Sequence, residues 1–222
     1  MIKKLIIITG GNLDVDFTCD FINKYANSYI IAVDKGLEYL NNIGVIPDVI
    51  LGDFDSLNPN ILKKYENKSD TLIKRFPCEK DDTDTQLAIK WATDICISNN
   101  TEFDEIFILG ATGTRIDHLL GNIHGLTYAY DKGISCCIID TNNKIFLVPE
   151  EYRIVRDNQF GRYISFFAID GDIELSLIGF KYPLKDYSLS VKQSLAVSNE
   201  IVDDEAVIIH RKGYLLGIES RD

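Results

Sequence analysis

Short β-branched apolar runs alternate with longer amphipathic stretches over the first two-thirds of the chain. The apolar runs are KLIIIT (4–9), YIIAVD (29–34), DVILGD (48–53), TLIKRF (71–76), EIFILG (105–110) and ISCCIID (134–140). Their length and composition predict strands. Between them, residues 83–97 and 117–130 place apolar side chains three or four positions apart, which predicts helices. We therefore expect an α/β, Rossmann-like domain with a parallel sheet over residues 1–142.

The pattern changes after about residue 142, where no long helical stripe follows. Strand-like runs are separated there by Gly, Pro, Asp and Asn: KIFLV (144–148), GRYISFFAI (161–169), DIELSLI (172–178), LSVK (189–192), EAVIIHR (205–211) and YLLGIE (214–219). This arrangement predicts a small all-β sandwich domain over residues 143–222.

Charge and composition limit the classes of partner. The 222 residues carry a formal net charge of −11, so the chain lacks the Lys/Arg excess that drives binding to nucleic acid. No apolar stretch approaches the roughly 18 residues of a membrane span, and the apolar run after the first lysines is too short for a signal peptide. The five cysteines include no C-x-x-C pair, which favours a reducing compartment. We expect a soluble, cytoplasmic protein that binds neither nucleic acid nor membrane.

Acidic residues follow two neighbouring predicted strands. Asp34 ends one strand, and Asp53 and Asp55 flank a Phe at the end of the next. Ligands of open parallel sheets bind beyond the carboxyl ends of the strands. Two close carboxylates ionise together at low cost when a cation lies between them, and Mg²⁺ prefers such oxygen ligands. The plainer interpretation is an Asx turn or a cap for a helix that begins near residues 58–59.

A second acidic group lies directly before the helix predicted at 83–97. Lys80 is followed by Asp81, Asp82, Thr83 and Asp84. Helix capping accounts for one of these acids, and three acids in four residues exceed what capping needs. Asp81 and Asp84 are therefore candidates to complete a metal site with Asp53 and Asp55.

A glycine-rich turn precedes the helix predicted at 117–130. The backbone N–H groups around Gly110, Thr112 and Gly113 suit an anion, and Arg115 offers a fork for phosphate oxygens. His118 and Asn122 follow at helical spacing; taken alone, each is more simply a partly buried histidine and a solvated asparagine. A carboxylate–metal cluster facing a phosphate cradle is typical of phosphoryl or pyrophosphoryl transfer from a nucleotide. The spacing leaves open which phosphorus is attacked.

These motifs, in this order, resemble the thiamine pyrophosphokinase family, whose members transfer pyrophosphate from ATP to the thiamine hydroxyl and release AMP. The similar segments are Asp34-Lys35-Gly36, Gly52-Asp53-Phe54-Asp55-Ser56, Lys80-Asp81-Asp82-Thr83-Asp84, Gly113 to His118 with Asn122, Gly179 to Leu184, and Val197 to Glu200. They span nearly the whole chain, and the set is specific although each motif alone is weak. Lys35 and Thr114 replace glycines of the family pattern, and Ile201 stands where Phe is usual.

The resemblance implies the site and the assembly. Mg²⁺ would be held by Asp53, Asp55 and Asp84, with Asp81 nearby, and Asp81 or Asp117 would accept the hydroxyl proton. ATP would contact Asp34, Ser56, Lys80, Gly110, Thr112, Gly113, Arg115, His118 and Asn122. Thiamine would contact Ser198 and Asn199 of the partner chain in a homodimer with its active site between subunits. An acidic cleft also suits the cationic thiazolium ring.

Three other interpretations remain open at this point. A phosphatase that forms an aspartyl-phosphate would use Asp53 as its nucleophile. A nucleotide-sugar transferase would use the D-x-D pair with a metal and release a nucleoside diphosphate. A nucleotide or thiamine sensor would keep the site without turnover, and Lys35 is the residue that favours it.

Overall fold

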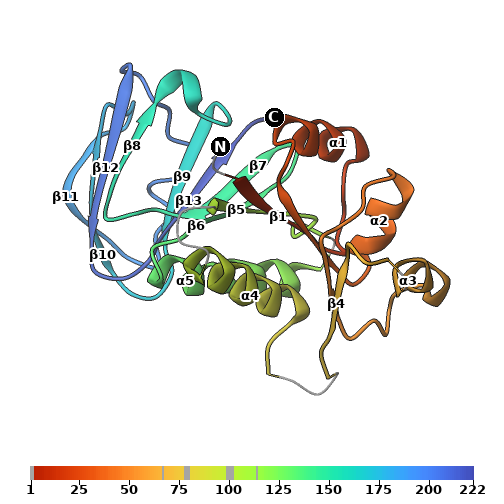
Figure 1. The fold of residues 1–222 in the computed structure, drawn as a ribbon. Helices are drawn as coiled ribbons and strands as arrows, with labels where there is room; N and C mark the ends of the chain where they lie inside the picture. The colour runs from red at the N-terminus through yellow and green to blue at the C-terminus, as the bar shows by residue number, and fades with distance from the viewer. Residues whose placement is uncertain (1–2, 67, 78–80, 99–102, 114) are drawn as a thin grey trace. The chain divides into compact units, whose positions relative to one another are not determined.

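The computed structural model describes residues 3–66, 68–77, 81–98, 103–113 and 115–222 (Figure 1). The chain divides into two compact units, Met1–Thr141 (unit 1) and Asn142–Asp222 (unit 2). None of the helices in the described ranges combines the length and apolar character needed to cross a membrane.

Unit 1 alternates strands and helices, as the hydrophobic pattern predicts. Its described elements are β1 (Lys3–Ile8), α1 (Val15–Lys24), β2 (Tyr29–Val33), α2 (Gly36–Asn42), β3 (Val49–Gly52), α3 (Pro59–Glu66), β4 (Leu72–Arg75), α4 (Asp84–Ser98), β5 (Phe103–Leu109), α5 (Ile116–Asp131) and β6 (Ser135–Ile139). The strands are parallel and lie in the order β4-β3-β2-β1-β5-β6. The order reverses direction between β1 and β5, so the loops after these two strands diverge and leave a crevice.

Helices cover both faces of the unit 1 sheet. On one face Trp91 of α4 lies against Tyr29 of β2, and α5 runs beside α4 (Figure 1). On the other face Phe21 of α1 packs edge-on against Phe107 of β5, with ring centroids 5.0 Å apart. The central strand β1 is accordingly buried on both sides from Leu5 to Ile8. This explains its unbroken apolar run, because a strand covered on both faces needs no polar alternation.

Unit 2 consists of antiparallel strands in its described part. These are β7 (Asn143–Leu147), β8 (Glu151–Val155), β9 (Tyr163–Ala168), β10 (Ile173–Ile178), β11 (Leu184–Leu189), β12 (Glu205–Arg211) and β13 (Leu215–Ser220), with a 3₁₀ turn at Arg156–Asn158. One set is ordered β7-β13-β9 and the other β11-β10-β12-β8. Alternate residues of β10 and β12 are buried, which is the pattern of a sheet with one face in a core. The expected α/β fold with a C-terminal all-β region is confirmed.

One strand prediction in unit 2 was misplaced, and one strand was missed. The expected strand at 189–192 lies five residues earlier, as β11, and β8 was not predicted at all. Both strands are mostly exposed: β11 buries Leu189 fully and β8 buries Ile154. Strands that bury so few side chains show little alternation of apolar and polar residues. Hydrophobic periodicity therefore predicts them poorly.

Candidate active site

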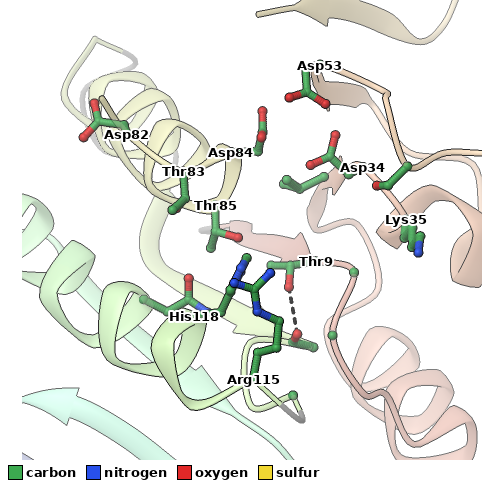
Figure 2. A pocket seen from close by; sticks show the side chains of 17 residues that line it. Thr9, Asp34, Lys35, Asp53, Asp82, Thr83, Asp84, Thr85, Arg115 and His118 are labelled. Atoms are coloured by element: carbon green, nitrogen blue, oxygen red, sulfur yellow. Dashed lines mark hydrogen bonds between the residues drawn. The ribbon is translucent and has the colours of Figure 1, made fainter. Parts of the chain in front are cut away.

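A cavity of about 500 Å³ lies at the carboxyl ends of β1, β2, β3 and β5 in unit 1 (Figure 2). Its position matches the crevice expected where the strand order reverses. The residues that line it are Thr9, Gly10, Gly11, Val33, Asp34, Lys35, Asp53, Ser56, Asp82, Thr83, Asp84, Thr85, Gly110, Gly113, Arg115, His118 and Asn122.

Three carboxylates converge in this cavity. Asp34 follows β2, Asp53 follows β3 and Asp84 begins α4, and one oxygen of each lies within 4.8 Å of the other two. Figure 2 shows their carboxylate groups turned toward one another. Like charges at this separation repel unless a cation neutralises them. All three donors are hard oxygens, so the set fits Mg²⁺, which is commonly held by one or two carboxylates together with phosphate and water.

The backbone beside these carboxylates takes an uncommon conformation. Asp34 has φ = 46° and Phe54 has φ = 66°, values that non-glycine residues seldom adopt. Gly52 has φ = 150°, and a Cβ built on it would lie 1.8 Å from Oδ1 of Asp34. The glycine therefore leaves the space that the Asp34 carboxylate occupies. Strained backbone of this kind concentrates at ligand sites, where the surrounding fold holds it in place.

A threonine caps the start of α4. Thr83 Oγ1 accepts a hydrogen bond from the Gln86 N–H (3.2 Å), and Gln86 Oε1 accepts one from the Thr83 N–H (3.0 Å). This reciprocal pair is a capping box, so the cap expected from one of the acids is supplied by Thr83 instead. Asp82 forms an ion pair with Lys90 (2.6 Å). Asp84 lines the cavity from the first turn of the helix.

The glycine-rich turn after β5 forms a different wall of the cavity. Gly110 has φ = 75°, and a Cβ on it would lie 2.6 Å from the Thr9 carbonyl oxygen. Thr9 Oγ1 donates to the Gly110 carbonyl (2.8 Å), and Asn122 Nδ2 donates to the Ala111 carbonyl (3.1 Å). Asn122 is buried, not the solvated residue of the plainer interpretation. These bonds fix the turn against β1 and α5.

Arg115 and Asp117 form a two-point ion pair at the start of α5. Arg115 Nη2 and Nε lie 2.5 Å and 3.1 Å from the two Asp117 oxygens. The Arg115 guanidinium lowers the pKa of the Asp117 carboxyl to about 2. A carboxylate with so low a pKa is a weak proton acceptor at neutral pH. Arg115 and His118 line the cavity, and both are exposed.

The structure brings together most, but not all, of the residues expected at the site. Asp34, Asp53, Ser56, Asp84, Gly110, Gly113, Arg115, His118 and Asn122 line the cavity, whereas Asp55, Asp81, Thr112 and Asp117 do not. Asp55 is exposed, and its backbone N–H donates to Asp53 Oδ1 (3.1 Å). Lys80 and Thr114 lie outside the described residues.

The lining residues Thr9, Gly10 and Gly11 were missed by sequence reasoning. The available signal was the polar, glycine-rich turn after the first strand, which has the same form as the turn after β5. A Cβ on Gly11 would lie 2.1 Å from the Gly110 carbonyl oxygen, so the two turns touch. Asp34 was expected to contact ATP, and the structure places it among the converging carboxylates instead.

Two departures from the family pattern are explained by the structure. Lys35 has φ = −59°, in the right-handed helical region that any residue adopts, so it introduces no backbone strain. Ile201 is buried and forms a bridge with Phe180 inside unit 2.

Ser198 and Asn199, expected to contact thiamine, lie in unit 2 and differ from each other. Asn199 is 2% exposed; its Nδ2 donates to the Tyr182 carbonyl (2.9 Å), and its Oδ1 accepts from the N–H groups of Tyr182 (3.0 Å) and Glu200 (2.9 Å). Ser198 is exposed, has φ = 55°, and donates its N–H to Ser165 Oγ (3.0 Å). The Asn199 amide thus makes three hydrogen bonds inside the protein, and Ser198 is an exposed residue.

Comparison with known proteins agrees with this geometry. Residues 23–138 match the family model "Thiamin pyrophosphokinase, catalytic domain", and residues 151–215 match "Thiamin pyrophosphokinase, vitamin B1 binding domain". A thiamine pyrophosphokinase of Bacillus subtilis is 37% identical over 226 residues, covering 99% of this chain and all of the relative.

Solved structures give the same result. A crystal structure of thiamine pyrophosphokinase from Bacillus subtilis superposes with a TM-score of 0.82 at 35% identity, covering 99% of this chain and 100% of that one. The enzyme from Geobacillus thermodenitrificans gives 0.79 at 30% identity, covering 100% and 98%. With motifs, fold and whole-length similarity in agreement, the chain belongs to the thiamine pyrophosphokinase family.

Proposed function

We propose that this protein transfers pyrophosphate from ATP to the hydroxyl of thiamine, giving thiamine diphosphate and AMP in a Mg²⁺-dependent reaction. The observation that carries the proposal is the cavity of unit 1, where three converging carboxylates and a glycine-rich turn line one space. The family membership of the chain supplies the substrate pair.

Asp34, Asp53 and Asp84 are the residues that would hold Mg²⁺ in this reaction. The bound ion would neutralise charge on the transferred phosphates. Asp55 follows Phe54 on the same loop, and its backbone N–H orients the Asp53 carboxylate. A ligand role for Asp55 requires its exposed side chain to turn toward Asp53.

The other cavity residues position and neutralise the phosphates. The backbone of the Gly110–Gly113 turn offers N–H groups, Arg115 offers a guanidinium, and His118 stands beside it at the cavity wall. In-line attack by the thiamine hydroxyl on the β-phosphorus would then release AMP. Asp117 is disfavoured as the proton acceptor because its pKa is about 2. Among the two acids first considered, Asp81 is exposed and outside the cavity lining, so it also lacks support from the geometry.

Unit 2 is proposed to supply the thiamine contacts. Ser198, which is an exposed residue, would contact the substrate directly through its hydroxyl. Asn199 would act by holding the backbone of Tyr182, whose side chain is 59% exposed. The strained φ of Ser198 supports a ligand role, because such backbone persists where the fold requires it.

We further propose a cytoplasmic homodimer with the active site between subunits. Ile116 and Leu120 lie one turn apart on α5, with 70% and 53% of their surface exposed, and would be covered by a second copy. Cys19, Cys96, Cys136 and Cys137 are free thiols, in keeping with a reducing compartment. Light scattering after size exclusion tests the dimer; a monomer at all concentrations would refute it.

The test of the function is product analysis after incubation with ATP, Mg²⁺ and thiamine. We expect AMP and thiamine diphosphate in equal amounts, with both lost on addition of EDTA. ADP as the nucleotide product would indicate transfer of a single phosphoryl group. A phosphorylated Asp53 would indicate the phosphatase chemistry, and tight ATP binding without any product would indicate a sensor.

A further inference from the structure

Lys35 is a cation at the cavity to which neither the proposed metal site nor the glycine-rich turn after β5 assigns a task. It directly follows Asp34, takes an unstrained helical conformation (φ = −59°, ψ = −15°) and lines the cavity with an exposed side chain. Figure 2 shows it beside Asp34, on a different wall from Arg115. Its place there calls for a physical account, since a long charged side chain stands next to one of the converging carboxylates.

Among the charged residues that line the cavity, the ammonium of Lys35 is available to bind a ligand. The described lining carries four carboxylates, Asp34, Asp53, Asp82 and Asp84, and two permanent cations, Lys35 and Arg115. Arg115 is held by both oxygens of Asp117. The Lys35 ammonium makes no hydrogen bond or ion pair with any residue in the described part of the chain, and its backbone carbonyl accepts from the Glu38 N–H.

The neighbouring backbone adds donors on the same wall. A Cβ on Gly10 would lie 2.9 Å from Cβ of Lys35, so the turn after β1 rests against this lysine. Gly10 and Gly11 both line the cavity, and neither donates its N–H to a described residue. Successive unsatisfied N–H groups in a turn attract anions, and an adjacent ammonium strengthens the local positive field.

We propose that Lys35, together with the N–H groups of Gly10 and Gly11, forms a second phosphate-binding wall that contacts the polyphosphate of the nucleotide. This inference rests on the proposed function and assigns a contact to the same site. Arg115 and the Gly110–Gly113 turn hold the phosphates from one wall, and Lys35 holds them from another. A lysine suits this task because its ammonium is a point charge on a flexible stem that reaches a phosphate oxygen without a fixed geometry.

The test compares Lys35→Gln and Lys35→Glu with a matched control, Lys63→Gln. Lys63 is an exposed lysine on α3 that does not line the cavity. Calorimetry gives the Kd for ATP with Mg²⁺, and steady-state kinetics gives KM for ATP and for thiamine. We expect Lys35→Gln to weaken ATP binding about tenfold, the usual effect of losing a hydrogen bond to a charged group. Lys35→Glu should weaken it further, Lys35→Arg should restore it, and the thiamine KM and the control should be unchanged.

Two competitors locate the contact on the nucleotide. Inorganic tripolyphosphate should lose affinity in Lys35→Gln by the same factor as ATP, whereas adenosine should bind both proteins equally. Unchanged tripolyphosphate binding with weakened adenosine binding would place Lys35 at the nucleoside and overturn the proposal.

The binding readout separates this inference from the proposed function. If the wild-type protein binds ATP but makes no thiamine diphosphate, the function fails and the Lys35 comparison still decides the inference. If turnover is normal and Lys35→Gln binds ATP as tightly as wild type, the inference fails alone. A wild-type protein that does not bind ATP would overturn both.

Discussion

The cavity of unit 1 and the paired segments Gly179–Tyr182 and Val197–Ile201 of unit 2 use their polar side chains in opposite ways. In the cavity, carboxylates from three elements converge on one space. In unit 2, Lys181 and Arg162 both bind Glu200, at 2.7 Å and 3.0 Å, and Asn199 holds the backbone of Tyr182.

This difference helps to distinguish short polar motifs that bind a ligand from those that have a structural role. Both regions look like ligand-binding motifs in the sequence, yet one gathers carboxylates around a cavity and the other largely joins two chain segments. The distinguishing feature is where the hydrogen bonds go: a polar group that is buried and fully paired within the chain has a structural task. Four experiments test this difference between the two regions.

The largest effect should come from the converging carboxylates. Asp53→Asn removes one charge of the cluster and should reduce kcat by about 10³-fold, since a catalytic metal contributes several kcal/mol. The free energy of unfolding should be unchanged or higher, because repulsion is relieved. The same kinetics on Asp55→Asn show whether Asp55 belongs to the metal site, because an equal loss of kcat would make it a further ligand. Near-normal activity of Asp53→Asn would contradict the assignment of a metal site to these carboxylates.

Gly52→Ala should have the next largest effect. The added Cβ would lie 1.8 Å from Asp34 Oδ1 and displace that carboxylate, so the Mg²⁺ concentration for half-maximal activity should rise at least about tenfold. Gly44→Ala is the control: it also has positive φ (75°), but nothing lies within 4 Å of its Cβ. It should lose stability alone, with the Mg²⁺ dependence of wild type; the same Mg²⁺ shift in both variants would mean that backbone strain, not displacement, is the cause.

Asn199→Ala and Ser198→Ala should separate structure from substrate contact in unit 2. Asn199→Ala leaves the N–H and C=O of Tyr182 without partners and should lower the free energy of unfolding by roughly 1–3 kcal/mol. Ser198→Ala should leave stability unchanged and raise the KM for thiamine more than that for ATP. Urea denaturation and kinetics on both variants check this; a stable Asn199→Ala with a high thiamine KM would reverse the assignment.

The smallest effect concerns His210, a buried histidine of β12. Its ring Nε2 lies 2.8 Å from the Val148 carbonyl oxygen, and its Nδ1 has no partner among the described residues. Burial lowers the pKa of His210 in the folded protein. The unfolded chain therefore takes up a proton near the ordinary pKa of about 6.5, where the folded protein does not.

Stability from His210 should thus be fully present above pH 6.5 and decline as the pH falls below it. In His210→Gln the amide still reaches the Val148 carbonyl but does not titrate. Urea midpoints between pH 7.5 and pH 5 should fall more steeply for wild type than for the variant. An equal fall of the urea midpoint with pH in both proteins would show that other groups control stability at acidic pH.

The sequence predicted the parts of the fold that buried apolar runs determine. The strand at Leu5–Ile8 is fully buried, and the helices at 84–98 and 116–131 each bury one face, so the hydrophobic period marks them clearly. Strands β8 and β11 lie largely in solvent and left no such mark.

At the site, residue type and strand order indicated which side chains meet but not how they pair. Asp34, Asp53, Asp84, the glycine-rich turn and Arg115 line one cavity at the expected edge of the sheet, whereas Asp55 and Asp81 do not. The sequence did not reveal that Thr83 would cap α4 or that Arg115 would pair with Asp117. Such pairings depend on rotamers and loop conformation, which no spacing rule determines.

The converging carboxylates have a consequence for how the protein unfolds. Asp34, Asp53 and Asp84 come from three separated segments, and they meet because β2, β3 and α4 are in place. An unfolded chain has no equivalent site, so Mg²⁺ with nucleotide should act as a ligand of the native state alone and raise the melting temperature with concentration. The rise in melting temperature with Mg²⁺ and nucleotide would then report on the native fold without any need for catalytic turnover.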